Sequence, residues 1–309
     1  MNITKNLKEN KIYRYIIITP VRDEESCIKL TVKSVINQTQ KPILWIIVDD
    51  GSTDDTGRIL DHYATQYDWI RVVHRENRGY RAAGSGVIAA FNEGYTRVPI
   101  EGWDFIVKLD GDLSFEPNYF ERCFSRFEED KVLGLAGGTV FNHRNGKLVV
   151  DSIGDPCFHV RGATKIYRRL CWEQISPLEQ APGWDTIDEV KANFYGWATR
   201  TFSDIALIQH KPTGGADGHW RNWYKNGLGC YMAGYHPVFM LGKCAKRCFE
   251  KPFFIIAVAL FLGYCSGSLK SRGQAQDKEV VRYLQKQQLR YLLRRSSIYD
   301  RPNTPKQYQ

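Results

Sequence analysis

The segment Lys108-Leu109-Asp110-Gly111-Asp112 carries the residues of this chain that are best suited to chemistry. Two carboxylates separated by one small residue, at the end of the apolar run 105–109, can converge on one hard cation. A divalent ion held in this way bridges the protein to a diphosphate and neutralises charge that would otherwise repel the carboxylates. An isolated Asp-x-Asp string is equally compatible with a solvated acidic turn, so its context decides between the two interpretations.

Two further polar clusters follow apolar, β-branched runs in the same way. PVRDEE at 20–25 follows the run 15–19, and DDGST at 49–53 follows the run 43–48. Together with a third run at 70–73, these segments alternate with helical patterns at 26–37, 54–67 and 82–95. Such alternation predicts βαβ units and a mostly parallel sheet. Because ligands bind beyond the carboxyl ends of parallel strands, we expect the three polar clusters to meet at one edge of the sheet.

Composition bounds the class of protein. The 309 residues are 43% hydrophobic and 25% charged, which excludes a disordered, collagen-like or polytopic membrane protein. This length suits one large α/β domain with an appendage, or two small domains. The N-terminal segment is polar and lacks the apolar core of a signal peptide. The eight cysteines are scattered without a metal-binding spacing, which predicts free thiols in a reducing compartment.

The order and spacing of PVRDEE, VDDGSTDDT at 48–56 and DGD at 110–112 resemble the family 2 nucleotide-sugar glycosyltransferases. The resemblance covers about residues 13–215. It implies the GT-A fold and an inverting transfer of a sugar from a nucleoside diphosphate donor, assisted by Mn²⁺ or Mg²⁺. The QxxRW string of processive synthases is absent. The resemblance therefore implies a non-processive transferase.

The resemblance also assigns donor-binding roles to matching positions. It places Thr19, Pro20 and Val21 at the base pocket, with Asp23 or Glu24 supporting the loop. Asp50 would hydrogen-bond the base, because an acceptor-only carboxylate can take the N–H of a uracil or guanine ring. Asp49 is more simply a turn and helix-cap residue. The remaining assignments are Asp110 and Gly111 at the ribose, Asp112 at the metal, Arg78 or Arg81 at the diphosphate, and His210 at the metal or diphosphate.

An inverting transferase needs a base that removes the proton of the acceptor hydroxyl. The family places an acidic residue before a helix, about eleven residues ahead of a glycine. Asp185 has this spacing to Gly196, and Asp188 is the rival candidate. Asp185 is also a candidate N-cap of a helix predicted at 186–195. Trp184 is interpreted either as a sugar-stacking residue or as a core residue.

The segment 214–234 is rich in glycine and aromatic residues, which predicts a loop or lid rather than regular structure. Such a lid would close over the donor. Arg221 or Lys225 would then offset the charge of the leaving group.

The net charge of +9 is concentrated at the C-terminal end. The chain carries +10 from Lys243 onward and −1 before it. An apolar run at 253–264 and a basic amphipathic helix predicted at 270–296 follow. This pattern suits an anionic membrane surface, with an apolar packing face or a homodimer interface as the alternative. Nucleic-acid binding is disfavoured, because aromatic residues are not interleaved with the basic ones.

We therefore predict an α/β GT-A catalytic domain at 1–242 and a basic amphipathic helical tail at 243–309. The catalytic domain comprises a nucleotide-binding half (13–130) and an acceptor half with a lid (131–242). The predicted activity is sugar transfer to a possibly lipid-linked glycan in cell-surface polysaccharide synthesis, at the cytoplasmic inner face of the membrane. UDP is the default nucleotide, with GDP and dTDP open. The alternatives are a nucleotidyltransferase that makes nucleotide sugars and a non-catalytic scaffold on a degenerate transferase fold.

Overall fold

The structure, a computed structural model of the chain, describes residues 11–79, 85–99, 101–144, 146–151, 154–156, 158–211, 218–250, 253–270 and 273–300. Arg81, predicted to contact a diphosphate, lies outside these residues, as does the part of the predicted lid at 214–217.

The described strands form one nine-stranded sheet with the order β3-β2-β1-β4-β8-β6-β9-β5, and β7 pairs with β6. From β3 to β4 all neighbours run parallel, whereas β8 joins β4 and β6 in antiparallel fashion. The strands are β1 (Tyr15–Val21), β2 (Leu44–Asp49), β3 (Ile70–His74), β4 (Phe105–Leu109), β5 (Leu113–Phe115), β6 (Leu133–Arg144), β7 (Lys147–Val150), β8 (Thr164–Arg168) and β9 (Ala198–Gln209).

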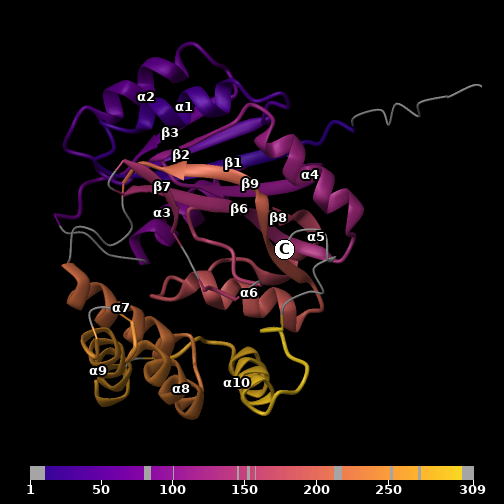
Figure 1. Cartoon of the computed structure of the whole chain (residues 1–309). Coiled ribbons are helices and arrows are strands. Elements are labelled where there is room, and N and C mark those ends of the chain that lie inside the picture. The colour runs from indigo at the N-terminus through magenta and orange to yellow at the C-terminus, as the bar shows by residue number, and fades with distance from the viewer. Residues whose placement is uncertain are drawn as a thin grey trace, which may run out of the picture.

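Helices cover both faces of this sheet (Figure 1). Side chains alternate along β1, so that Ile17 packs with the α1, α2 and α4 side and Ile16 with the α3, α5 and α6 side. Strands buried on both faces read as continuous apolar runs, which is why the sequence revealed them. The helices are α1 (Ile28–Ile36), α2 (Thr56–Ala64), α3 (Ser85–Thr96), α4 (Tyr119–Glu129), α5 (Arg169–Ile175), α6 (Trp184–Phe194), α7 (Gly218–Met232), α8 (Pro237–Arg247), α9 (Ile255–Leu269) and α10 (Lys278–Leu292). The predicted α/β fold is confirmed.

A layer of four helices, α7 to α10, lies beside α6, away from the sheet (Figure 1). The prediction of a loop or lid at 214–234 is wrong for residues 218–232, which form α7. The glycines that suggested a loop instead allow two helices to pack closely. A Cβ at Gly227 would lie 2.0 Å from the Leu260 carbonyl oxygen, and a Cβ at Gly263 would lie 2.0 Å from that of Tyr224. Only glycine permits this contact between α7 and α9.

The C-terminal elements refine the predicted tail. The apolar run is α9, and the basic helix is α10, which is shorter than the predicted 270–296. The boundary predicted at residue 243 falls inside α8, so the division into domains stays a prediction. α10 packs on α6 through Val280 and Leu284, which contact Val190. Among the described residues, no helix combines the length and apolar character that crossing a membrane requires.

Candidate active site

The three polar clusters meet at one edge of the sheet, as predicted. β1 pairs in parallel with β2 on one side and β4 on the other, with Val21 opposite Asp49. The loops that leave these strands therefore emerge together. A Cβ at Gly111 would lie 2.6 Å from Val21 Cγ1, so the small residue between the two aspartates lets the β4 loop pack against the end of β1.

The loops after β1 and β2 are joined by reciprocal hydrogen bonds. The Asp23 backbone N–H donates to Ser52 Oγ at 3.0 Å, and Asp23 Oδ1 accepts from the Thr53 backbone N–H at 2.8 Å. The Glu24 backbone N–H donates to Thr56 Oγ1 at 2.7 Å. These contacts join the loop after β1 to the loop after β2.

The three residues assigned to the base pocket lie within β1 itself. Thr19 is fully buried, and its Oγ1 accepts from the Trp45 indole N–H at 2.9 Å. Pro20 and Val21 are also buried. All three therefore lie buried within β1, at or just before its carboxyl end.

The two aspartates after β2 have different environments. Asp49 accepts from the Ser52 backbone N–H and lies 2.9 Å from His74 Nδ1, which is the turn role that the sequence favoured. Asp50 lies between two guanidinium groups, at 2.5 Å from Arg75 and in contact with Arg78. The structure therefore brings Arg78 and Asp50 together. The Asp50 carboxylate is engaged by these arginines rather than facing open solvent.

The Asp-Gly-Asp segment is mostly buried. Asp112 is 5% exposed and accepts from Gln209 Nε2 at 3.2 Å and from the Lys211 backbone N–H at 3.3 Å. Burial raises the pKa of Asp112 to about 7, and repulsion from Asp110 and Glu24 adds to this rise. Carboxylates that repel one another in this way are relieved by a cation.

Repulsion among these carboxylates makes the Asp-Gly-Asp segment a place where a cation would be favourable. Within the described residues, no group of three or more His, Cys, Asp and Glu side chains is arranged to hold a metal ion. His210 Nε2 lies 2.9 Å from Ser114 Oγ, so its assigned metal role is not supported by a cluster of ligands. Asp112, whose charged form is disfavoured by its acidic neighbours, is the residue that such a cation would stabilise.

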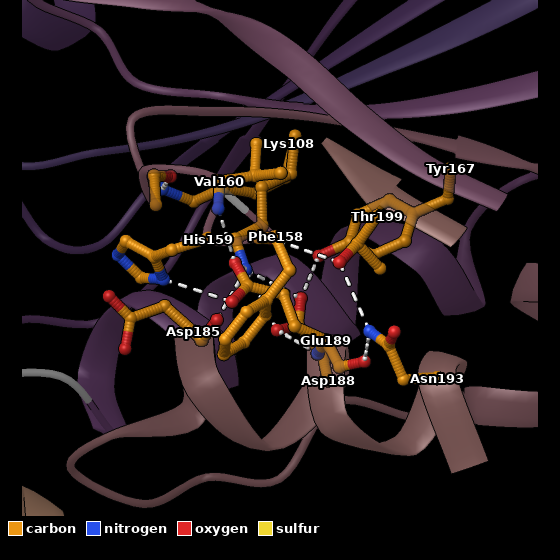
Figure 2. A network of polar contacts seen from close by, with 12 residues as sticks. Lys108, Phe158, His159, Val160, Tyr167, Asp185, Asp188, Glu189, Asn193 and Thr199 are labelled. Carbon is orange, nitrogen blue, oxygen red and sulfur yellow. Dashed lines mark hydrogen bonds and ion pairs between the residues drawn. The ribbon is translucent and has the colours of Figure 1, made fainter. Parts of the chain in front are cut away.

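The two candidate bases lie on the first two turns of α6 and face different surroundings. In Figure 2 the Asp185 carboxylate points away from the cluster that contains Asp188 and Glu189. Among the described residues, no other side chain donates a hydrogen bond to Asp185. Asp188 is 4% exposed, and its carboxylate accepts from Lys165 Nζ at 2.8 Å and from the Tyr167 hydroxyl at 2.5 Å.

A buried ion network fixes this end of α6 (Figure 2). Lys165 Nζ donates to the Asp185 carbonyl oxygen at 2.6 Å, to Asp188 at 2.8 Å and to Glu189 Oε1 at 2.8 Å. Glu189 also accepts from the Val160 backbone N–H and contacts His159 Nδ1 at 2.9 Å. The network ties β8 and the segment before it to the turn that carries Asp185.

Electrostatics keep Asp185 ionised. Burial by itself would raise the pKa of Asp185, but His159, Lys165 and Arg161 offset burial and hold that pKa below its ordinary value. An ionised carboxylate at neutral pH is the form that can accept a proton.

Trp184 links this network to the Asp-Gly-Asp strand. Lys108 and Lys165 are paired directly opposite each other on β4 and β8, and both are buried. Their ammonium groups lie 5.3 and 5.1 Å from the centre of the Trp184 ring. Lys108 contacts Asp110 and the Gly162 carbonyl oxygen. Trp184 is buried and therefore has the position of a core residue close to both ammonium groups.

Some residues that shape the site were not singled out in the sequence. Lys211 donates to the Asp23 carbonyl oxygen at 2.6 Å and pairs with Glu24 at 2.8 Å, which joins the end of β9 to the β1 loop. Lys165 was also not singled out, although a lysine inside the apolar strand β8 (TKIYR) was an available signal for it. The assigned residues Arg221 and Lys225 lie exposed on α7, and no described contact brings them to the Asp-Gly-Asp segment.

His159 provides a pH-dependent prediction. Burial lowers the pKa of His159, but Glu189 and Asp155 outweigh burial and raise the pKa from 6.5 to about 8. Its contribution to stability is therefore complete below about pH 6.5 and is lost as the pH rises through about 8. We expect wild type to lose about 2 kcal/mol of unfolding free energy between pH 6 and 9 relative to His159→Gln. Urea unfolding at both pH values measures this difference, and parallel pH profiles would contradict it.

The sequence of this chain is similar to those of known glycosyltransferases. A family model described as Glycosyl transferase family 2 matches residues 16–169. The chain is 27% identical over 168 residues to glycosyltransferase GlyG of Streptococcus pneumoniae, covering 54% of this chain and 50% of GlyG. It is 31% identical over 128 residues to the chondroitin synthase of Escherichia coli, covering 41% of this chain and 17% of that enzyme. The chain thus spans half or less of the length of these curated relatives.

Solved structures share the fold at low sequence identity. The mannosyltransferase PcManGT from Pyrobaculum calidifontis, solved with GDP-Man and Mn²⁺, is 15% identical with a TM-score of 0.54, covering 92% of this chain and 86% of that one. S. aureus TarS 1–349 is 15% identical with a TM-score of 0.51, covering 89% of this chain and 79% of that one. These likenesses show that the chain has the GT-A fold.

Proposed function

Because the chain belongs to glycosyl transferase family 2, we propose that it moves a sugar from a nucleoside diphosphate sugar to a hydroxyl group of a glycan acceptor, with inversion at the anomeric carbon. The observation that carries this proposal is the neighbourhood of Asp110 and Asp185. Lys108 contacts both Asp110 and the Gly162 carbonyl oxygen. A Cβ at Gly162 would lie 3.8 Å from the Asp185 Cβ. A donor-side carboxylate and an ionised candidate base thus flank one short segment.

The proposed reaction uses these residues in sequence. Asp185 accepts the proton of the acceptor hydroxyl as its oxygen bonds to the anomeric carbon. The bond from that carbon to the diphosphate breaks, and its electron pair leaves with the nucleoside diphosphate. Attack from the side opposite the leaving group inverts the configuration. Asp188 is disfavoured as the base, because Lys165 and Tyr167 occupy its carboxylate.

The donor end is proposed to follow the resemblance. Asp50 and Arg78 would contact the base and the diphosphate, and Asp110 would contact the ribose. A Mn²⁺ or Mg²⁺ ion held by Asp112 would supply positive charge to the leaving diphosphate. Arg221 and Lys225 of α7 remain candidates for offsetting the negative charge of the leaving diphosphate. UDP-GlcNAc is bound in a TarS structure and GDP-Man in that of PcManGT. Donors with uracil and with guanine are therefore both included in the binding test below.

The acceptor is proposed to be a lipid-linked glycan of a surface polysaccharide, reached by peripheral association with an anionic membrane. α9 is apolar on all sides: Leu260 is buried, while Val258, Phe261 and Leu262 are 40–47% exposed. A helix that is apolar all round is normally covered on every side. The excess of basic residues after Lys243 makes an anionic lipid surface the favoured cover for its outer face. A second copy of the chain is the alternative cover.

Donor binding tests the proposed function directly. With Mn²⁺, the cognate nucleotide sugar is expected to stabilise wild type by about 2.7 kcal/mol at one hundred times its dissociation constant. Asp112→Asn should lose this stabilisation while melting no lower than wild type without ligand, because the change removes a carboxylate repelled by Asp110 and Glu24. Thermal melting with UDP- and GDP-sugars measures both effects.

The matched control is Asp68→Asn, which alters an exposed aspartate after α2. It should respond to donor as wild type does. A donor response that survives in Asp112→Asn would contradict the assigned role of Asp112. No response to any nucleotide sugar in wild type would instead favour the scaffold alternative.

A further inference from the structure

A cavity of about 440 Å³ lies between the N-terminal end of α8 and the outer side of α10. Its lining includes four cationic side chains, together with His236 and two leucines. The cations are Arg282, Lys286, Arg290 and Arg295. No acidic residue lines this cavity, which we call the α10 pocket.

The α10 pocket is built on one face of a helix whose other face is fixed. Arg282, Lys286 and Arg290 recur every four residues and therefore share one side of α10. Val281 and Leu284, on the opposite side, are buried against α6, and Val281 also packs on Ala233, directly after α7. The helix is thus anchored by its apolar face, which holds the cationic face in place.

The cations of the α10 pocket have no internal counter-charge. In the part of the chain that the structure describes, no ion pair joins Arg282, Lys286, Arg290 or Arg295 to a carboxylate. Arg290 Nε donates only to the Ser296 carbonyl oxygen, at 2.6 Å. Four positive charges around one cavity repel one another, and a bound anion removes that repulsion.

The donors of the pocket suit a phosphate group. A guanidinium presents a planar fork of N–H groups that matches phosphate oxygens. His236 Nδ1 accepts from the Val238 backbone N–H at 3.2 Å, so the neutral ring carries its proton on Nε2 and offers a further donor. The α10 pocket also exposes apolar surface, because Leu289 is 36% and Leu293 65% exposed.

We propose that the α10 pocket binds the phosphate group of an anionic lipid, with Leu289 and Leu293 against the adjoining apolar part of that lipid. This inference rests on the proposed membrane association but not on the transfer reaction. It assigns recognition of the lipid phosphate to α10 and insertion into the apolar part of the membrane to α9. Variants of the two helices can therefore measure the two contributions to membrane binding separately.

Melting temperature titrated with glycerol phosphate, at constant ionic strength, tests the phosphate site without lipid. Wild type should be stabilised, and Arg282→Gln/Lys286→Gln should need at least about tenfold more ligand for the same shift. Lys286→Gln and Lys278→Gln form a matched pair, because both remove one exposed lysine from α10 but only Lys286 lines the pocket. Lys278→Gln should titrate as wild type. Equal responses of both variants, as expected for phosphate binding at the donor site, would overturn the proposal.

Vesicle flotation distinguishes a lipid from a soluble phosphate ester. Wild type should bind phosphatidylglycerol vesicles and not pure phosphatidylcholine vesicles, and the double variant should lose at least about tenfold in binding. Phe261→Glu on α9 should lose vesicle binding yet keep the response to glycerol phosphate. Glycerol phosphate binding by wild type without vesicle binding would overturn the lipid assignment. Concentration-dependent dimerisation that Phe261→Glu abolishes would overturn membrane insertion by α9.

Discussion

Asp185→Asn is expected to lower the turnover rate by about 10²–10⁴-fold, which is the usual contribution of a general base. The asparagine keeps the size of the side chain but cannot accept the proton of the acceptor hydroxyl. His159, Lys165 and Arg161 hold the pKa of Asp185 below its ordinary value, so wild type is ionised and competent at neutral pH. Release of nucleoside diphosphate from the donor identified by melting, with Mn²⁺ and water as acceptor, measures this loss.

Donor binding separates this effect from misfolding. Asp185→Asn should keep the thermal response to the nucleotide sugar, because Asp185 is placed on the acceptor side. Asp68→Asn should keep both binding and turnover. Asp188→Asn should lose stability as well as activity, since it removes a partner of the buried Lys165. If Asp188→Asn lost turnover at unchanged stability while Asp185→Asn remained active, the base would be Asp188.

The meeting of the three polar loops was predictable because its determinants are local. Each of its loops follows an apolar run, and the parallel pairing of β1 with β2 and β4 brings the loops together without any distant information. The aspartates at 49–50 and 110–112 are thus positioned by the strands that directly precede them. An apolar run followed by polar residues is a short-range pattern from which the end of a strand can be predicted.

The acceptor side was less predictable because its determinants are distant in the sequence. Asp185 and Asp188 are three residues apart on one helix, and the spacing to Gly196 favoured Asp185 but left Asp188 as a rival. The difference is made by Lys165 and Tyr167 on β8, whose side chains reach Asp188 across more than twenty residues. Nothing near Asp188 in the sequence reports that its carboxylate is already engaged.

α7 shows how tertiary packing reverses a local signal. Gly227 lowers helix propensity and suggested a loop, but its missing side chain is what lets α7 approach Leu260 of α9. The cost of glycine in the helix is offset by a contact that appears only when both helices are placed. The same contact leaves the outer side of α9 exposed, which is the basis of the proposed membrane association.

Lys165→Met is expected to lower the free energy of unfolding by about 3–5 kcal/mol at pH 8, because it leaves buried carboxylates without their cation. Lys165 is fully buried, and so is Glu189, one of its partners. Asp188 also depends on Lys165 for its charge balance. Burial raises the pKa of Asp188 to about 7 even with Lys165 present, and loss of the lysine would raise that pKa further. Urea unfolding of the variant against Lys147→Met, an exposed lysine of β7, measures the effect.

The pH dependence of this loss identifies its cause. A carboxylate whose folded-state pKa is raised carries no penalty when it is protonated in both states. Its penalty grows as the pH rises from the unfolded-state pKa to the folded-state pKa, and it is complete above the latter. The deficit of Lys165→Met should therefore be smaller at pH 5 than at pH 8, whereas a packing defect would be equal at both. Adding Asp188→Leu should recover part of the stability, because it removes one of the stranded charges. A variant as stable as wild type at pH 8 would show that the network does not hold α6, and with it Asp185, in place.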